Sequence, residues 1–365
     1  MRRWFAVVFV LALAVAAAFI LLVMSRRPPT LSVVTWAGAY GRAQSSALFI
    51  PYQARSGADL HIAEYDGGLR ELRNAVSRGR YPFDAIDLEL PDAVAACRQG
   101  LLERIDPASL PAGRSGEPAA QDFVAGAIGG CWIGSVVYSQ IVGFDPRRFS
   151  GTQPSSLADF FDLARFPGPR ALRGDSAKMN LELALLADGV APAEVYRALE
   201  TDEGLGRAFA KLDSIRGSLV WWTRSDEPVE MLADGRAAMA TLLNGSLFDA
   251  AAHHRRIGAI WDRQLYEMDV FAIPKGDPKR AMALDFIRFA TAPSSLARMA
   301  DWAPYGPARL SALGLVGRNP ELGIAMTPFL PTAPSHFKTA FAVDDGWWLD
   351  HGAEIEARWR AWLRQ

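Results

Sequence analysis

FDAIDLELPDAVAACRQG, residues 83–100, is the stretch that decides the fold class of this chain. Apolar and acidic residues alternate from Phe83 to Leu90, which predicts a strand. The segment from Pro91 to Gln99 predicts a helix that Gly100 ends. A strand that runs straight into a helix is the unit from which α/β sheets with mostly parallel strands are built.

The same alternation continues on both sides of this stretch, without tandem repeats or low-complexity tracts. Further strands are predicted at residues 31–36, 60–64, 136–144, 219–223, 237–243 and 270–274. Further helices are predicted at residues 68–78, 181–188, 195–212, 229–234, 280–290 and 347–362. A break is expected at residues 167–169, where two prolines flank a glycine. The sequence therefore predicts an α/β protein.

Length and charge narrow the class of protein further. A chain of 365 residues is long for one core and suits two lobes behind an N-terminal segment. The net charge is −1, and the four arginines within residues 1–27 leave 35 basic against 40 acidic residues in the remainder. Such a balance gives no electrostatic footprint for nucleic acid.

The N-terminus has the pattern of an export or anchor segment. Two arginines, Arg2 and Arg3, precede 21 uncharged residues at 4–24, and Arg26 and Arg27 follow them. The run is longer than a typical secretory core and could span a bilayer, so residues 1–28 are expected to form an uncleaved signal-anchor. A cleaved signal peptide is the alternative. Either way, the large domain is expected in the periplasm, and an uncleaved signal-anchor would tether it to the inner membrane.

Two cysteines, Cys97 and Cys131, are the only ones in the chain. In an exported protein they could form a disulfide, or they could be two buried thiols that never meet. Neither CxxC nor a Cys/His cluster with metal-ligand spacing occurs, and the motifs of serine hydrolases, zinc proteases and P-loop proteins are missing. We therefore expect no metal, no cofactor and no enzymatic activity.

Eight segments resemble, in the same order, the extracellular solute-binding proteins of ABC transporters, in the spermidine- and putrescine-binding branch. They are residues 34–40 (VTWAGAY), 83–106, 161–175 (FDLARFPGPRALRGD), 181–196, 219–228 (LVWWTRSDEP), 231–246, 266–278 (YEMDVFAIPKGDP) and 303–308 (APYGPA). The resemblance implies a bilobal periplasmic-binding-protein fold of type II, with residues 31–135 plus 266–308 in lobe 1 and 136–265 plus 309–365 in lobe 2. It also implies a hinge of two crossings near residues 133–138 and 262–269.

The resemblance further implies the function. The protein is expected to act as a monomer that binds a polyamine, or a similar small organic cation, between the lobes and delivers it to an ABC transporter permease. A membrane-tethered sensory or interaction protein that uses the same fold is the alternative. An enzyme on this fold is disfavoured because no nucleophile with a positioned base is recognisable.

Four acidic residues are candidates for the ligand's ammonium groups, because a buried ammonium needs a carboxylate partner. Asp87 and Glu89 share one face of the strand at residues 83–90. Asp269 matches the carboxylate beside the second crossing in the resembled family. Asp175 matches an acidic loop position there, although it could instead cap a helix.

Aromatic and amide side chains complete the expected site, since aromatic faces attract both cations and methylene chains. By the resemblance, Trp36, Tyr40 and Tyr305 surround the ligand, and Trp222 and Asn244 form its walls. The aromatic cage is thinner than in known polyamine receptors. They carry aromatic residues where this chain has Leu243 and Glu267, and an acid and an aromatic where it has residues 37–39 (AGA). The exact ligand therefore does not follow from the sequence.

Overall fold

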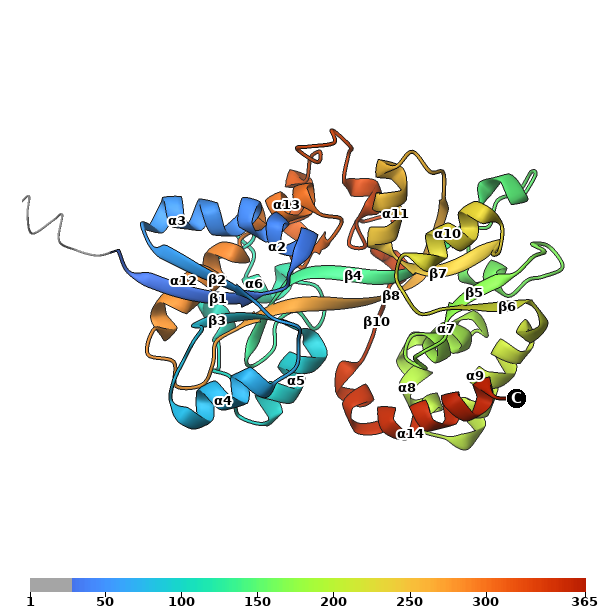
Figure 1. The fold of residues 1–365 in the computed structure, drawn as a ribbon, viewed down its shortest axis with the longest axis horizontal. Coiled ribbons are helices and arrows are strands. Elements are labelled where there is room, and N and C mark those ends of the chain that lie inside the picture. Colours follow the sequence, from blue (N-terminus) through green and yellow to red (C-terminus); the bar gives the residue numbers. More distant parts are fainter. Residues whose placement is uncertain (1–27) are drawn as a thin grey trace, which may run out of the picture.

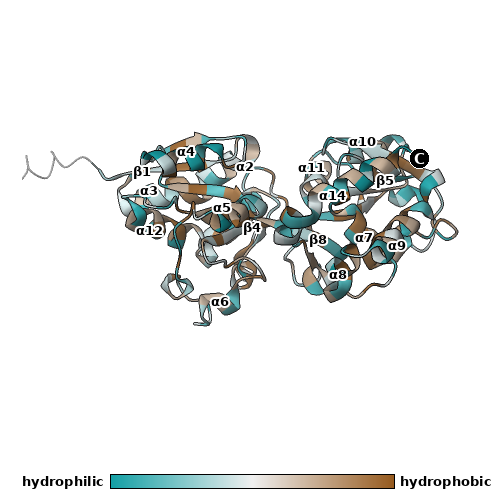
Figure 2. Ribbon diagram, turned by 90° about the horizontal axis from the view of Figure 1, so that it is seen from below, coloured by the Kyte–Doolittle hydropathy of each residue, from teal (hydrophilic) through white to brown (hydrophobic). Residues whose placement is uncertain are grey.

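Two α/β lobes are joined by two long strands in the computed structural model, which describes residues 28–365 (Figure 1). Strands β4 (Trp132–Phe144) and β8 (Gly258–Ala272) pair antiparallel from Trp132 opposite Ala272 to Phe144 opposite Gly258. Each therefore begins in one lobe and ends in the other. The predicted bilobal α/β architecture is confirmed, and Figure 2 shows the narrow waist between the lobes.

The first lobe is built on β1 (Thr30–Thr35), β2 (Asp59–Glu64) and β3 (Ala85–Glu89). β1 lies between β2 and β3 and runs parallel to both, and β3 pairs antiparallel with the end of β8. Its helical segments are α2 (Gly38–Gln44), a π-helical turn (Ser45–Phe49), α3 (Ile50–Ser56), α4 (Arg70–Arg78), α5 (Leu90–Arg98), α6 (Ala119–Asp122), α12 (Arg280–Ala290) and α13 (Pro293–Trp302).

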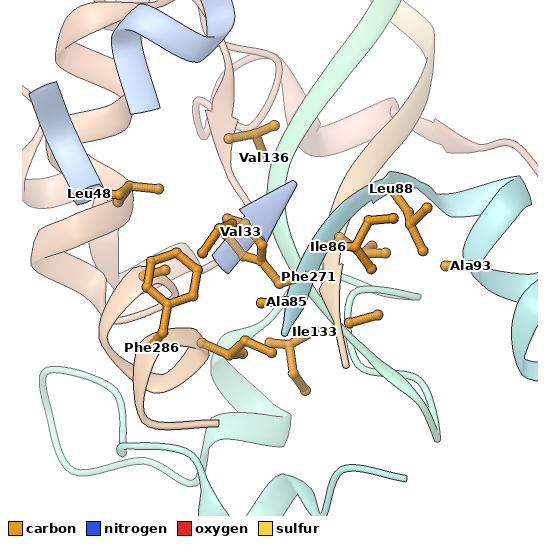
Figure 3. Close-up of a cluster of buried hydrophobic side chains, with 14 of the residues drawn as sticks. Val33, Leu48, Ala85, Ile86, Leu88, Ala93, Ile133, Val136, Phe271 and Phe286 are labelled. Carbon is orange, nitrogen blue, oxygen red and sulfur yellow. The ribbon is translucent and has the colours of Figure 1, made fainter. Parts of the chain in front are cut away.

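Helices cover both faces of this sheet, which explains why its inner strands β1 and β3 are largely buried, whereas the edge strand β2 is mostly exposed. Ile86 and Leu88 of β3 are buried with Phe271 of β8 and Phe286 of α12, as Figure 3 shows. Asp87 is also fully buried within this strand, so a polar network has to stabilise it. That network lies at the edge of the cleft between the lobes.

The second lobe contains β5 (Arg170–Arg173), β6 (Leu219–Trp222) and β7 (Met239–Leu243). β5 lies between β6 and β7, parallel to both, and β7 pairs antiparallel with β4. Its helices are α7 (Asn180–Ala187), α8 (Val195–Leu199), α9 (Asp202–Asp213), α10 (Glu227–Asp234), α11 (Asn244–Ala252) and α14 (Asp345–Leu363). The predicted terminal helix is confirmed as α14, which buries Trp359 completely.

The chain passes between the lobes a third time after α13, in addition to the two hinge strands, as the predicted division of the chain between the lobes implies. β9 (Gly306–Pro307) pairs with β4, and β10 (Phe341–Ala342) pairs with β8 shortly before α14. The predicted entry into lobe 2 at residue 309 differs from the structure, because Arg309 forms a buried ion pair with Asp122 of the first lobe. Buried residues up to 333 still pack beside α13.

Two strands differ from the sequence prediction. β5 starts at Arg170, directly after the predicted break, because the buried Arg170 guanidinium donates to the backbone carbonyls of Phe160 and Gly168 and fixes the turn. β8 begins at Gly258, twelve residues before the predicted strand, because its first half pairs with β4 rather than following an apolar pattern. Short 3-10 turns lie at Pro107–Ser109, Pro146–Arg148, Leu157–Phe160, Pro192–Glu194, Arg216–Ser218, Leu310–Leu315, Thr327–Phe329 and Phe337–Thr339.

The predicted signal-anchor at residues 1–28 lies, except for Pro28, outside the described residues. Among residues 28–365, no helix has the length and apolar character needed to cross a bilayer. Apolar colouring concentrates on the strands and inner helix faces of each lobe in Figure 2.

Cys97 of α5 and Cys131, just before β4, form a disulfide, with their Cα atoms 5.9 Å apart. The bond closes a loop of 34 residues, so its removal is expected to lower the free energy of unfolding by about 3–4 kcal/mol through the entropy of the unfolded chain. Urea unfolding of the oxidised protein and of the Cys97→Ser/Cys131→Ser variant would measure the difference. Equal midpoints for the two proteins would contradict the prediction.

Candidate ligand-binding cleft between the lobes

A cleft of about 500 Å³ opens between the lobes, where β3, β4 and β8 of the first lobe meet the start of α11 in the second. Its lining is mostly aromatic and apolar, with three carboxylates. Within the described part of the chain, no lysine or arginine lines it. The lining residues are Trp36, Ala37, Ala39, Tyr40, Glu89, Tyr138, Leu243, Asn244, Gly245, Phe248, Asp249, Asp269, Trp302, Ala303, Pro304 and Tyr305.

Glu89 and Asp269 form an acidic pair in this cleft. They lie directly opposite each other in the antiparallel register of β3 and β8, at the point where β8 leaves the first lobe. Asp269 is only 6% exposed, and burial, followed by the charges of Asp87 and Glu89, raises its pKa well above the usual range. A ligand cation between the two carboxylates would relieve their repulsion.

Asp87 lies behind the cleft lining, covered by Tyr40 of α2. The Tyr40 hydroxyl donates to Asp87 Oδ2 over 2.8 Å, and Gln44 Nε2 donates to the same oxygen over 2.5 Å. Asp87 Oδ1 is buried without a hydrogen-bond partner among the described residues. The structure thus separates Asp87 from Glu89, its predicted neighbour in the site. Asp87 orients Tyr40 rather than lining the cleft.

The three aromatic residues of the expected cage, Trp36, Tyr40 and Tyr305, all line the cleft. The Tyr40 and Tyr305 rings meet edge to face, with their centres 5.1 Å apart, and Trp36 packs 5.0 Å from Tyr65. Gly67 supports the Trp36 ring: it has a φ of +88°, and a Cβ there would approach the ring to 3.2 Å. Such faces suit an ammonium with a methylene chain.

Asn244 lines the cleft, but its amide is used to hold the lobes together. Its Oδ1 accepts from the Ser139 backbone N–H over 2.9 Å, and its Nδ2 donates to the carbonyls of Pro304 and Phe329. These contacts join α11 to the crossing strand β4 and to the segment that follows α13. The structure therefore gives Asn244 a positioning role at the hinge.

Asp175 and Trp222 lie outside the cleft lining. Trp222 is only 4% exposed, and its Nε1 donates to Thr241 Oγ1 over 3.3 Å. Asp175 accepts from Arg173 Nε over 2.7 Å, an ion pair that was not predicted from the sequence. β5 starts and ends with arginine and therefore lacks the apolar pattern of a strand. For this reason the sequence did not indicate that Arg173 lies at the end of a strand.

Glu267, whose role the sequence left open, belongs to an ionic cluster on the second-lobe side of β8. Lys178 Nζ donates to Glu267 and, over 2.6 Å, to Asp345 at the start of α14. Burial raises the pKa of Asp345 to about 8, and the charge of Glu267 adds to the shift. Both Lys178 and Glu267 are therefore engaged within the protein.

Ligand affinity is expected to fall when the pH drops from about 8 to about 6. Burial raises the pKa of Asp87 to about 7 and that of Asp269 well above its usual range. A bound ammonium favours the ionised form of these carboxyl groups. Below the pKa values that the carboxyl groups have in the free protein, binding therefore releases protons, and protons compete with the ligand. Calorimetry in two buffers of different ionisation enthalpy would measure this release. Equal affinity at both pH values would contradict the prediction.

Known proteins that are similar in sequence or in structure support the assignment of this fold. The family model described as "Bacterial extracellular solute-binding protein" matches residues 47–322. A protein of Pseudomonas aeruginosa, named gamma-aminobutyric acid-binding protein, is 36% identical over 333 residues, which cover 91% of this chain and 90% of that protein.

Two solved structures are similar along nearly the whole chain. A structure titled as a GABA receptor is 27% identical, has a TM-score of 0.73, and is matched over 92% of this chain and 97% of its own. An ABC transporter substrate-binding protein from Bradyrhizobium japonicum USDA 110 is 26% identical, has a TM-score of 0.75, and is matched over 92% and 99%.

Two lobes on a shared pair of strands, with an acidic and aromatic cleft between them, define a type II solute-binding protein. The chain belongs to the bacterial extracellular solute-binding proteins, and it is a periplasmic solute-binding component of an ABC transporter. Its partners are a small-molecule ligand and a transporter permease, and its family consists of transport proteins rather than enzymes. These comparisons support membership of the family, but they do not support the polyamine-binding branch that was expected from the sequence.

Proposed function

We propose that the cargo is a small linear molecule with a primary ammonium group, held between Glu89 and Asp269. The observation that carries the proposal is the acidic pair in register across β3 and β8, with Asp269 almost completely buried. The two neighbouring carboxylates, Glu89 and Asp269, favour the binding of a cation, because a buried charge without a partner is costly.

The surrounding side chains support an amine over a larger cation. Tyr40, Tyr305 and Trp36 offer ring faces for an ammonium and its methylene chain. Asp249 adds a third carboxylate to the lining of the cleft. A volume of about 500 Å³ holds a chain of a few carbons together with ordered water.

The polyamine expected from the sequence and the γ-aminobutyrate named for the relatives share this chemistry. Putrescine carries an ammonium at both ends of four methylenes, whereas γ-aminobutyrate carries one ammonium and one carboxylate. Glu89 and Asp269 recognise the group that the two molecules have in common, so the proposal covers both.

Tethering to the inner membrane through residues 1–28 stays a prediction.

Calorimetric titration of the purified full-length protein would test the ammonium pole. Putrescine, spermidine, γ-aminobutyrate and butyrate are the ligands, with butyrate as the matched compound that has no ammonium. We expect butyrate not to bind and at least one of the amines to bind. Binding of butyrate as tight as that of γ-aminobutyrate, or no binding of any amine by the folded protein, would overturn the proposal.

A further inference from the structure

Arg173 ends β5 at the edge of the second lobe that faces the first. β5 and β7 run parallel, so their carboxyl ends lie at the same edge of the sheet. Leu243, the last residue of β7, lines the cleft, as do Asn244 and Gly245 directly after it. Arg173 therefore stands at the same rim, one strand away from the cleft lining.

The Arg173 side chain is held in a fixed orientation. Its Nε and Nη2 donate to Asp175 over 2.7 and 3.4 Å, and its guanidinium carbon lies 5.9 Å from the centre of the Trp222 ring. Its Nη1 has no hydrogen bond within the described part of the chain, and the side chain is 45% exposed. One edge of a pre-oriented guanidinium is thus open to a ligand.

The two rims of the cleft carry opposite charges. Arg173 interacts electrostatically with Glu89 of the first lobe, where its charge opposes the effect of burial on the pKa of that carboxyl. Lys178, the other cation that acts on Glu89, already holds Glu267 and Asp345. Of these two cations, Arg173 is therefore the one that can still donate hydrogen bonds to a ligand.

We propose that Arg173 binds a carboxylate of the ligand, so that the cargo is a linear ω-amino acid whose ammonium lies at Glu89 and Asp269. Two guanidinium N–H groups match the two oxygens of a carboxylate. Hinge closure about β4 and β8 would bring the two rims together around the ligand. A diamine would instead place its second ammonium against Arg173, which disfavours it.

Asp175 and Trp222 acquire a role in this arrangement as positioning residues. Asp175 fixes the Nε edge of the guanidinium, and Trp222 supports its face. Both were expected from the sequence to contact the ligand directly. This inference rests on the proposed ammonium pole, which the experiment below tests separately.

Arg173→Gln in the full-length protein would test the carboxylate pole. Arg216→Gln is a matched control. Arg216 also pairs with an aspartate, Asp213, and its guanidinium carbon lies 4.2 Å from the centre of the Trp362 ring. It precedes β6, however, and therefore lies at the opposite end of the sheet from the cleft. The ligands are γ-aminobutyrate, its uncharged amide γ-aminobutyramide, and putrescine, each titrated calorimetrically.

We expect the native protein to prefer γ-aminobutyrate to its amide and to putrescine. Arg173→Gln should weaken γ-aminobutyrate about 100-fold while changing the affinity for the amide little, and Arg216→Gln should change neither. Unchanged affinity for γ-aminobutyrate in Arg173→Gln, equal losses for acid and amide, or a native preference for putrescine would overturn the carboxylate pole. Failure of every amine to bind the native protein would instead overturn the ammonium pole.

Discussion

Asp269→Asn is expected to weaken ligand binding by about 100-fold or more. Asp269 is the most buried carboxylate of the cleft lining, and an amide of the same shape can accept a hydrogen bond from an ammonium but cannot neutralise its charge. Its repulsion from Asp87 and Glu89 disappears in the variant, so the fold should be at least as stable as that of the native protein. Calorimetry and thermal unfolding would measure the two effects separately.

Asp234→Asn is the matched control for this experiment. Asp234 pairs with Arg236 over 2.8 Å at an exposed site within the second lobe, at the end of α10, where removal of the charge should cost little. Glu89→Gln should have an effect between the two, because Glu89 is more exposed than Asp269. Native affinity in Asp269→Asn would show that the acidic pair does not hold the ligand.

Asp122→Ala is expected to lower the free energy of unfolding by about 3–5 kcal/mol. Arg309 Nε donates to Asp122 Oδ2 over 2.7 Å, and the two side chains are 0% and 1% exposed. The remaining Arg309 donors point to backbone carbonyls, among them that of Pro111. Removal of the carboxylate would leave a guanidinium buried without a counter-charge.

The double variant Asp122→Leu/Arg309→Met tells this penalty apart from loss of packing. An apolar pair of similar volume should recover most of the stability, because neither charge is then buried alone. Urea unfolding followed by tryptophan fluorescence would compare the variants at one pH. A loss below about 1 kcal/mol in Asp122→Ala would show that water reaches the guanidinium in the native protein.

Much of the local structure could be predicted from the sequence because its signals are local. The alternation at residues 83–90 and the glycine at position 100 bound β3 and α5 closely. β5 could not be predicted, because its arginines are stabilised by carbonyl groups and by a ring that lie elsewhere in the chain. The position of the third passage, after residue 333 rather than at residue 309, could not be predicted for a related reason, since β9 and β10 have two residues each.

The candidate site was predicted in part. Trp36, Glu89, Asp269 and Tyr305 line the cleft, as the resemblance implied. Asp175 and Trp222 were expected in the cleft itself but lie outside its lining, and Arg173, for which we propose a role, was not among the candidates. A residue type and its position along a strand indicate which chemistry is available, but they do not indicate which side chain another element covers.

The sequence by itself determined the alternation of strands and helices and the presence of carboxylates and aromatic rings, because periodicity and composition act over short distances along the chain. The two-lobed class followed from the chain length and from the family resemblance. The tertiary structure alone decided which of these groups meet the ligand cleft. Asp87 and Glu89 share one face of β3, yet Tyr40, 47 residues away in sequence, covers the first and leaves the second open. Packing of distant segments sets this difference, and no local pattern encodes it.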